Sequence, residues 1–171
     1  ALCELARAFP NSTFTGCDVS PTAINVAIAD TKQAGLSNIS YHVLRGESLP
    51  TSPKYDLVLT LDCLHDMTYP QQTLDAIRGC VNDDGVLVIK DIRCSDRDEE
   101  NLANPLAPML YSLSIIYCLS SALSEPNGAG LGTMGFNPVV AKAMTAKAGF
   151  TRFQQLEIEE DVFNYYYAAR P

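Results

Sequence analysis

The feature that most constrains the fold is a short apolar run that turns polar within a few residues. Residues 55–61 read Tyr-Asp-Leu-Val-Leu-Thr-Leu, and Asp62, His65 and Asp66 follow. An apolar run of this length after a proline-containing turn predicts a strand buried on both faces of a parallel sheet. Ligands of such sheets bind beyond the carboxyl ends of the strands. These ionisable groups are therefore candidates for chemistry, although they could equally be turn, cap or loop residues.

The rest of the chain alternates predicted helices with predicted strands. Strands are predicted over residues 13–18, 39–44, 55–61 and 86–92, and helices over residues 2–9, 23–34, 70–81, 106–123 and 138–147. The Asn-Asp-Asp-Gly sequence at 82–85 predicts a turn, and two late strands, 150–158 and 162–169, are spaced as an antiparallel hairpin. The connections between the early strands suit parallel pairing. The pattern predicts an α/β fold with a doubly wound, mostly parallel sheet and a C-terminal antiparallel hairpin.

Length and composition restrict the class of protein. The 171 residues suffice for one domain with a core, and an apolar share of 47% excludes a disordered chain. A net charge of −8 argues against nucleic-acid contact, which needs clustered Lys and Arg. No apolar run reaches the roughly 20 residues that span a bilayer. We expect a single domain over residues 1–171, with no nucleic-acid partner and no membrane segment.

The six cysteines and two histidines form no metal motif in the sequence. The cysteines occur singly, without a C-x-x-C pair or zinc spacing. They are interpreted as free, mostly buried thiols in a reducing compartment. This interpretation, and the lack of a visible targeting signal, favour a cytoplasmic protein without a metal.

Several short motifs follow one another in an informative order. They are Gly16-Cys17-Asp18-Val19-Ser20, Gly46-Glu47-Ser48, the run 55–65, Asp84-Gly85 before an apolar strand, and Gly149-Phe150-Thr151 before the penultimate strand. No single motif is specific, but together they cover almost the whole chain and resemble the class I S-adenosylmethionine-dependent methyltransferases. The resemblance implies a Rossmann-like fold, S-adenosylmethionine as the cofactor, and methyl transfer to an unidentified small-molecule acceptor.

The same resemblance implies that part of the domain precedes residue 1. The family's first strand and glycine-rich loop have no counterpart in the chain, and the helix 2–9 opens without a capping residue. The Asp62-Cys63-Leu64-His65-Asp66-Met67 variant is similar to a subgroup in which a winged-helix module precedes the methyltransferase domain. We therefore expect an N-terminally incomplete domain, with an upstream winged-helix domain in the parent protein and a homodimer left open.

Five residues near the first two predicted strands are candidates for cofactor binding. By the resemblance, Asp18 would accept hydrogen bonds from both ribose hydroxyls; alternatively, it only complements the N-terminus of the next helix. Val19 would face the adenine, or belong to the core. Gly46, Glu47 and Ser48 lie where the family's adenine-contacting loop does, with the register of that contact left open.

Four residues after the strand 55–61 are candidates for the reacting centre. By the resemblance, Asp62 and Cys63 would lie beside the cofactor's sulfonium, where a carboxylate can balance a cation. His65, with Asp66, is the candidate acid–base group, because an imidazole can remove a proton near neutral pH. Many methyl transfers need only alignment of an already nucleophilic atom, so a non-catalytic His65 also stays open.

A glycine-rich segment, residues 128–135, contains G-x-G-x-G but lacks the context of a cofactor loop. Such a loop follows a strand and opens a helix, whereas a helix and a turn precede this one. We expect a flexible connection within a helical, lid-like insertion at about 95–136. Tyr111, Tyr117 and Met134 are candidates for lining the substrate pocket, with ordinary core or loop positions as the alternative.

Two other functions share most of these features. An NAD(P)-dependent Rossmann oxidoreductase also has a doubly wound sheet and an acid after the second strand, but it gives no reason for the closing hairpin. A catalytically inactive methyltransferase fold could serve as a regulatory domain. Binding of S-adenosylhomocysteine or NAD, and transfer of a labelled methyl group, would separate the three.

Overall fold

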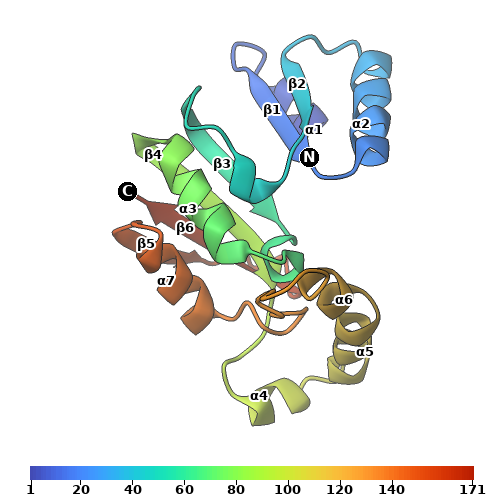
Figure 1. Ribbon diagram of the computed structural model, residues 1–171, viewed down its shortest axis with the longest axis vertical. Helices are drawn as coiled ribbons and strands as arrows, with labels where there is room; N and C mark the ends of the chain where they lie inside the picture. The colour runs from blue at the N-terminus through green and yellow to red at the C-terminus, as the bar shows by residue number, and fades with distance from the viewer. The chain divides into compact units, whose positions relative to one another are not determined.

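A computed structural model describes all residues, 1–171. The chain divides into two compact units, Ala1–Leu49 and Pro50–Pro171, and each unit contains its own sheet (Figure 1). The expectation of a single domain over residues 1–171 stays a prediction.

The first unit contains a two-stranded parallel sheet and two helices. Its elements are α1 (Leu2–Ala8), β1 (Phe14–Asp18), α2 (Pro21–Gln33), β2 (Ile39–Val43) and the 3-10 turn η1 (Gly46–Ser48). β1 and β2 pair in parallel, and their last pair is Asp18 with Val43. The carboxyl end of β1 therefore lies beside the chain that leads into η1.

Local sequence signals set the ends of α2. The Ser20 side chain accepts a hydrogen bond from the Ala23 N–H at 3.2 Å, and Pro21 occupies the first helical position. Gly35, just beyond the helix, has a φ of +67°, the left-handed conformation that commonly ends helices. The helix therefore covers Pro21–Gln33, within two residues of the predicted range 23–34.

Gly16 in the Gly16-Cys17-Asp18 motif makes room for a neighbouring ring. A Cβ at this position would lie 2.7 Å from the Tyr41 ring and 2.8 Å from the Leu2 side chain. The Tyr41 hydroxyl in turn lies 2.8 Å from Thr31 Oγ1 on α2. A side chain at position 16 would therefore disturb packing between β1, β2 and the helices.

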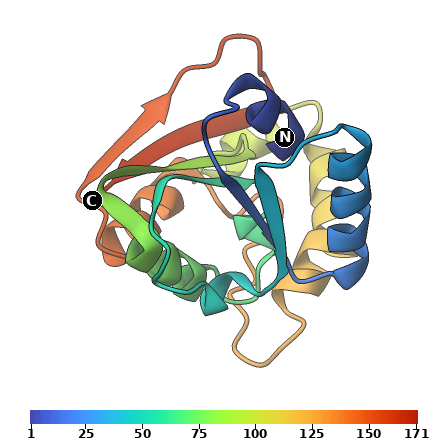
Figure 2. The same cartoon turned by 90° about the horizontal axis from the view of Figure 1, so that it is seen from above.

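The second unit is built on a four-stranded mixed sheet. Its strands are β3 (Tyr55–Leu61), β4 (Val81–Ile92), β5 (Arg152–Leu156) and β6 (Asn164–Arg170), in the spatial order β3-β4-β6-β5. β3 and β4 are parallel, whereas β6 is antiparallel to both β4 and β5 (Figures 1 and 2). The predicted parallel pairing and the C-terminal antiparallel hairpin are confirmed, with shorter hairpin strands than predicted.

Two helices pack beside this sheet. They are α3 (Pro70–Cys80) and α7 (Pro138–Lys147), which contact each other and lie on the same side of the sheet in Figure 1. Asn137 caps α7 by accepting the N–H groups of Val139 and Val140, and Pro138 takes the first position. The core between these layers includes fully buried side chains such as Leu74, Ile77, Leu87, Ile89 and Tyr167.

The predicted helix 106–123 forms, although it is not a uniform α-helix. It consists of α5 (Ala107–Leu113), the π-helical segment η3 (Ser114–Cys118) and α6 (Leu119–Ala122), and the short α4 (Asp98–Leu102) precedes it. Because a π-helical turn inserts an extra residue, a stripe read from 3.6-residue spacing shifts at η3. No helix in the chain has the length and apolar character needed to cross a bilayer.

The predicted turn at 82–85 is wrong in its boundaries. These residues belong to β4, which begins directly after α3. Their pairing is irregular, however: Tyr55 pairs with Val81 and Leu57 pairs with Val86, so four residues of β4 stand out from the ladder as a bulge. Gly85 allows this close approach, since a Cβ there would lie 3.1 Å from the Asp56 carbonyl oxygen.

Candidate active site

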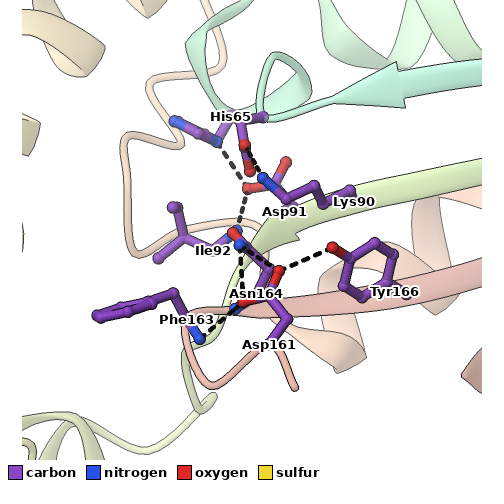
Figure 3. A network of polar contacts seen from close by, with 9 residues as sticks. His65, Lys90, Asp91, Ile92, Asp161, Phe163, Asn164 and Tyr166 are labelled. Carbon is purple, nitrogen blue, oxygen red and sulfur yellow. Dashed lines mark hydrogen bonds and ion pairs between the residues drawn. The ribbon is translucent and has the colours of Figure 1, made fainter. Parts of the chain in front are cut away.

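A buried histidine and a buried aspartate meet where β3 and β4 end. His65 lies in the 3-10 turn η2 (Leu64–Asp66), four residues after β3, and Asp91 lies next to the end of β4. The His65 Nδ1 and Asp91 Oδ1 atoms are 2.6 Å apart (Figure 3), and the two residues are 4% and 1% exposed. Because a carboxylate oxygen only accepts, His65 Nδ1–H is the donor. Nε2 is therefore the ring nitrogen left for chemistry.

Asp91 is the residue that sequence reasoning missed. Its Oδ1 also accepts the Ile92 N–H at 2.8 Å, and its Oδ2 is buried without a hydrogen-bond partner. The available signal was the Lys90-Asp91 pair inside an otherwise apolar predicted strand. A buried charge in such a strand needs a partner, and His65 is that partner.

The surroundings of the pair change its acid–base properties. Burial lowers the pKa of His65, but the hydrogen bond and charge of Asp91, together with the charges of Asp66 and Asp62, outweigh burial and raise that pKa above its ordinary value. Burial raises the pKa of Asp91, and the hydrogen bond from His65 opposes this increase. The imidazole therefore holds a proton more firmly than free imidazole does.

The other ring nitrogen of His65 faces a second carboxylate and a thiol. His65 Nε2 lies 3.3 Å from Asp66 Oδ1, and one ring nitrogen of His65, one carboxylate oxygen of Asp66 and Cys118 Sγ in η3 all lie within 4.8 Å of one another. The Thr133 hydroxyl donates to Cys118 Sγ at 2.8 Å. The imidazole thus has Asp91 at one nitrogen and Asp66 at the other, with Cys118 in the same cluster.

The glycine-rich segment 128–135 forms hydrogen bonds with the backbone of this turn. The Gly132 N–H donates to the His65 carbonyl at 3.1 Å, and the Ala129 N–H donates to the Thr68 carbonyl at 2.9 Å. A Cβ at Gly132 would lie 2.4 Å from Ser114 Oγ, and one at Gly128 would lie 2.2 Å from a backbone oxygen of α6. These glycines therefore permit close packing of the segment against η2 and α6, and the expectation of a flexible, lid-like connection stays a prediction.

Asp62 lies at the end of β3 with an unusual backbone conformation and a cationic neighbour. Its φ is +52°, a value uncommon for a residue other than glycine and often found at functional sites. Asp62 Oδ2 forms an ion pair with Lys90 Nζ, whereas Oδ1 is buried without a hydrogen-bond partner. The next residue, Cys63, is a neutral thiol, because burial raises its pKa to about 12.

A family model described as "Methyltransferase domain" matches residues 1–124. The chain belongs to this methyltransferase family. No curated protein matches the chain.

Solved structures of methyltransferases share the fold of this methyltransferase chain. A protein from Nostoc punctiforme assigned as an O-methyltransferase has a TM-score of 0.76 and 20% identity, covering 98% of this chain and 48% of that one. PigF, solved with SAH, has a TM-score of 0.73, 18% identity and coverages of 98% and 46%. The S-adenosylmethionine-dependent methyltransferase SibL, in its apo form, has a TM-score of 0.70, 20% identity and coverages of 99% and 47%. The chain spans slightly less than half of each, and the predicted Rossmann-like methyltransferase fold is confirmed.

The cofactor candidates of the first unit lie at one end of its sheet. Asp18 ends β1, is exposed, and accepts the Ser20 N–H through Oδ1 at 2.7 Å. Val19 is 62% exposed, so it is not a core residue. Gly46, Glu47 and Ser48 form η1, and Glu47 forms an ion pair with Arg45.

The three substrate candidates of the methyltransferase chain have different surroundings. Tyr117 is 65% exposed, which excludes the core position considered for it, while Tyr111 and Met134 are half-buried. None of them lines the cavity of about 280 Å³ beside the end of β4. That cavity is bounded mainly by Ile92, Arg93, Leu106, Leu110, Val162 and Phe163.

Proposed function

We propose that this domain transfers a methyl group from S-adenosylmethionine to a hydroxyl group of a small molecule. The observation that carries the proposal is the buried 2.6 Å hydrogen bond between His65 and Asp91, in a chain of the methyltransferase family. An imidazole held in this way suits proton removal from an acceptor hydroxyl. Structural neighbours assigned as an O-methyltransferase or solved with SAH support the same reaction.

The residues present fit an S-adenosyl cofactor. Asp18 is exposed, and its Oδ2, together with the remaining lone pair of Oδ1, which accepts the Ser20 N–H, can accept both hydroxyls of a ribose. Exposed Val19 offers apolar surface to an adenine. Gly46, Glu47 and Ser48 are the proposed contacts of the adenine edge. When bound, the cofactor supplies an electrophilic methyl carbon.

Two residues of the second unit are proposed to contact the sulfonium end of the cofactor. The buried, unpartnered Asp62 Oδ1 could balance a positive charge, while Oδ2 is already paired with Lys90. The neutral Cys63 thiol offers a compact, weakly polar neighbour. The ion pair with Lys90 limits how strongly Asp62 attracts the sulfonium, because the Lys90 ammonium repels a second cation.

The chain's own contribution to the reaction is deprotonation and positioning. His65 Nε2 takes the proton of the acceptor hydroxyl as the oxygen bonds to carbon, and Asp91 holds Nδ1–H so that Nε2 keeps its lone pair. Asp66 lies beside Nε2 and stabilises the imidazolium that forms. A base of this strength favours phenols, whose hydroxyl pKa of about 10 is far below that of alcohols. The acceptor class we propose is therefore a phenol.

The two alternatives are supported less well. An NAD(P)-dependent oxidoreductase shares the sheet, but the family match is to methyltransferases. An inactive regulatory fold would give no functional reason for a buried, charge-paired histidine beside a second carboxylate.

The proposal also includes a cytoplasmic location, which agrees with the six free cysteines. It includes an upstream winged-helix module in the parent protein and no nucleic-acid partner, and it leaves a homodimer open.

The test is a transfer assay with S-adenosylmethionine labelled in its methyl group and a panel of phenols and aliphatic alcohols. We expect label in the phenol fraction, S-adenosylhomocysteine as the coproduct, and loss of both in His65→Ala. Calorimetric titration with S-adenosylhomocysteine and with NAD runs in parallel. Binding of NAD without binding of S-adenosylhomocysteine would overturn the proposal in favour of the oxidoreductase.

A further inference from the structure

We infer that His65 Nε2, Asp66 Oδ1 and Cys118 Sγ form a binding site for a divalent transition-metal ion, with Zn²⁺ as its typical occupant. Nε2 and Oδ1 are 3.3 Å apart, and one potential ligand atom from each of the three residues lies within 4.8 Å of the other two. Imidazole, carboxylate and thiolate are the ligand types that Zn²⁺ takes in proteins. Zn–N bonds of about 2.1 Å and Zn–S bonds of about 2.3 Å bring ligand atoms roughly 3.5 Å apart. Small side-chain movements would therefore bring the three ligand atoms to the separation that a Zn²⁺ site needs.

The histidine is already oriented as metal-binding histidines are. Such a ligand usually donates its other ring N–H to a carboxylate, which fixes the tautomer and strengthens the metal-binding nitrogen. The 2.6 Å hydrogen bond from Nδ1 to Asp91 Oδ1 is this contact (Figure 3). It leaves Nε2, which lies 3.3 Å from Asp66 Oδ1, as the nitrogen available to a metal.

One oxygen of the carboxylate at the site is buried and forms no hydrogen bond, although His65 Nε2 lies 3.3 Å from it. Asp66 Oδ1 is buried and has no hydrogen-bond partner, a state that costs free energy unless a partner arrives. The rest of the Asp66 side chain is 41% exposed, so an ion can reach the site from solvent. A metal ion would satisfy this oxygen.

The third ligand comes from a distorted helical turn. Cys118 ends the π-helical segment η3, and π-turns inside helices are frequent at functional sites. The Thr133 hydroxyl donates to its sulfur at 2.8 Å, a contact that stabilises the thiolate once a metal has displaced the proton. Three protein ligands leave a fourth coordination position for water, as in open zinc sites.

Metal binding would compete with the proposed reaction. The metal would take the same Nε2 lone pair that we assign to proton removal, so it would act as an inhibitor and not as a cofactor. Inhibition rests on the proposed function, whereas metal binding itself does not. The two are therefore tested separately.

The binding test is a titration of the purified, metal-free protein with Co²⁺, followed by thiolate-to-cobalt charge-transfer absorption. We expect one equivalent to saturate the absorption, competition by Zn²⁺, and loss of the band in Cys118→Ser. The matched control is Cys17→Ser, an exposed cysteine of β1, which should keep the band. Asp66→Asn should weaken binding at least about tenfold. Absence of the band in the folded wild type, or its persistence in Cys118→Ser, would overturn the site.

The inhibition test measures methyl transfer at increasing Zn²⁺ concentration. We expect Zn²⁺ to inhibit the wild type reversibly, with recovery on chelation, and to need at least about tenfold more metal in Cys118→Ser. If the wild type transfers no methyl group, the cobalt titration still decides whether the metal site exists. If transfer occurs and saturating Zn²⁺ leaves it unchanged, the inhibitory role is wrong.

Discussion

The imidazole of His65 and the carboxylate of Asp91 share a buried hydrogen bond although they are 26 residues apart in the chain. Parallel pairing of β3 with β4 brings this about, because both strands end at the same edge of the sheet. η2 then turns His65 back toward β4. The pair explains why a charged residue is tolerated inside an apolar strand, and it gives the proposed reaction its base.

Replacing His65 by Ala should reduce kcat for methyl transfer by about 10²- to 10⁴-fold, the usual contribution of a general base. Affinity for S-adenosylhomocysteine should be retained, because the base contacts the acceptor. Steady-state kinetics and calorimetry measure the two effects. The control is His42→Ala, the other histidine, which is exposed on β2. Equal loss of activity in both variants would contradict the base role.

Asp91 is proposed as a positioning residue, so its substitution should affect kcat more than the acceptor KM. In Asp91→Asn an amide N–H can face Nδ1 and favour the tautomer that protonates Nε2. We expect kcat to fall by about 10- to 1000-fold, with partial recovery in Asp91→Glu. Circular dichroism of each variant separates this effect from unfolding. A rise in KM with unchanged kcat would assign Asp91 to binding instead.

Asp18→Asn should weaken binding of S-adenosylhomocysteine without abolishing the fold. Hydrogen bonds to a charged group contribute about 1.5–3 kcal/mol, so the dissociation constant should rise about 10- to 100-fold. Isothermal calorimetry measures it. Asp30→Asn removes an equal charge from an exposed position on α2 and serves as the control. Unchanged affinity in Asp18→Asn would leave Asp18 with only its hydrogen bond to Ser20.

Gly132→Ala should destabilise the protein more than Gly35→Ala. Both glycines have a φ of +67°, and an alanine in this conformation costs about 1–2 kcal/mol. A Cβ at Gly35 meets nothing within 4 Å, whereas one at Gly132 meets Ser114 Oγ at 2.4 Å, which adds about 1–3 kcal/mol of overpacking. Urea denaturation measures the free energy of unfolding. Equal losses of unfolding free energy in the two variants would show that the glycine-rich segment adjusts to the added methyl group at no extra cost.

Stability in acid should depend on Asp161, which holds the start of β6. Its carboxylate accepts hydrogen bonds from the Asn164 side chain, the Tyr166 hydroxyl and two backbone N–H groups (Figure 3). The side chains of Asn164 and Tyr166, in that order, lower the pKa of Asp161 to about 2. A carboxyl with a lowered pKa stabilises the fold above its ordinary value of 3.8, and this contribution is lost as the pH falls toward about 2.

Urea midpoints of the wild type and Asp161→Asn test this expectation. The difference between them should be constant above about pH 5 and shrink as the pH falls toward 2. Glu159→Gln, in the same loop, is the control, because no hydrogen bond or ion pair involves its side chain. A difference that stays the same down to pH 2 would contradict the assignment.

Much of the architecture was predictable because its signals are local. Ser20-Pro21 and Asn137-Pro138 mark helix starts through contacts within three residues of themselves, and the apolar run 55–61 specifies a buried strand by its own composition. Even His65 was found this way, since it follows that strand closely. The boundary error at 82–85 arose because Asn-Asp-Asp-Gly also satisfies local turn chemistry, whereas the bulge depends on β3.

The sequence by itself determined the α/β class, the order of most helices and strands, and the polar residues after β3. Only the tertiary structure decided what those residues meet: Asp91 at Nδ1, Asp66 at Nε2 with Cys118 in the same cluster, and Gly132 against the backbone of His65. The physical reason is how far apart in the sequence the contacting residues lie. A cap or a buried strand depends on neighbours a few residues away, whereas a buried pair depends on which strands lie side by side and in what register.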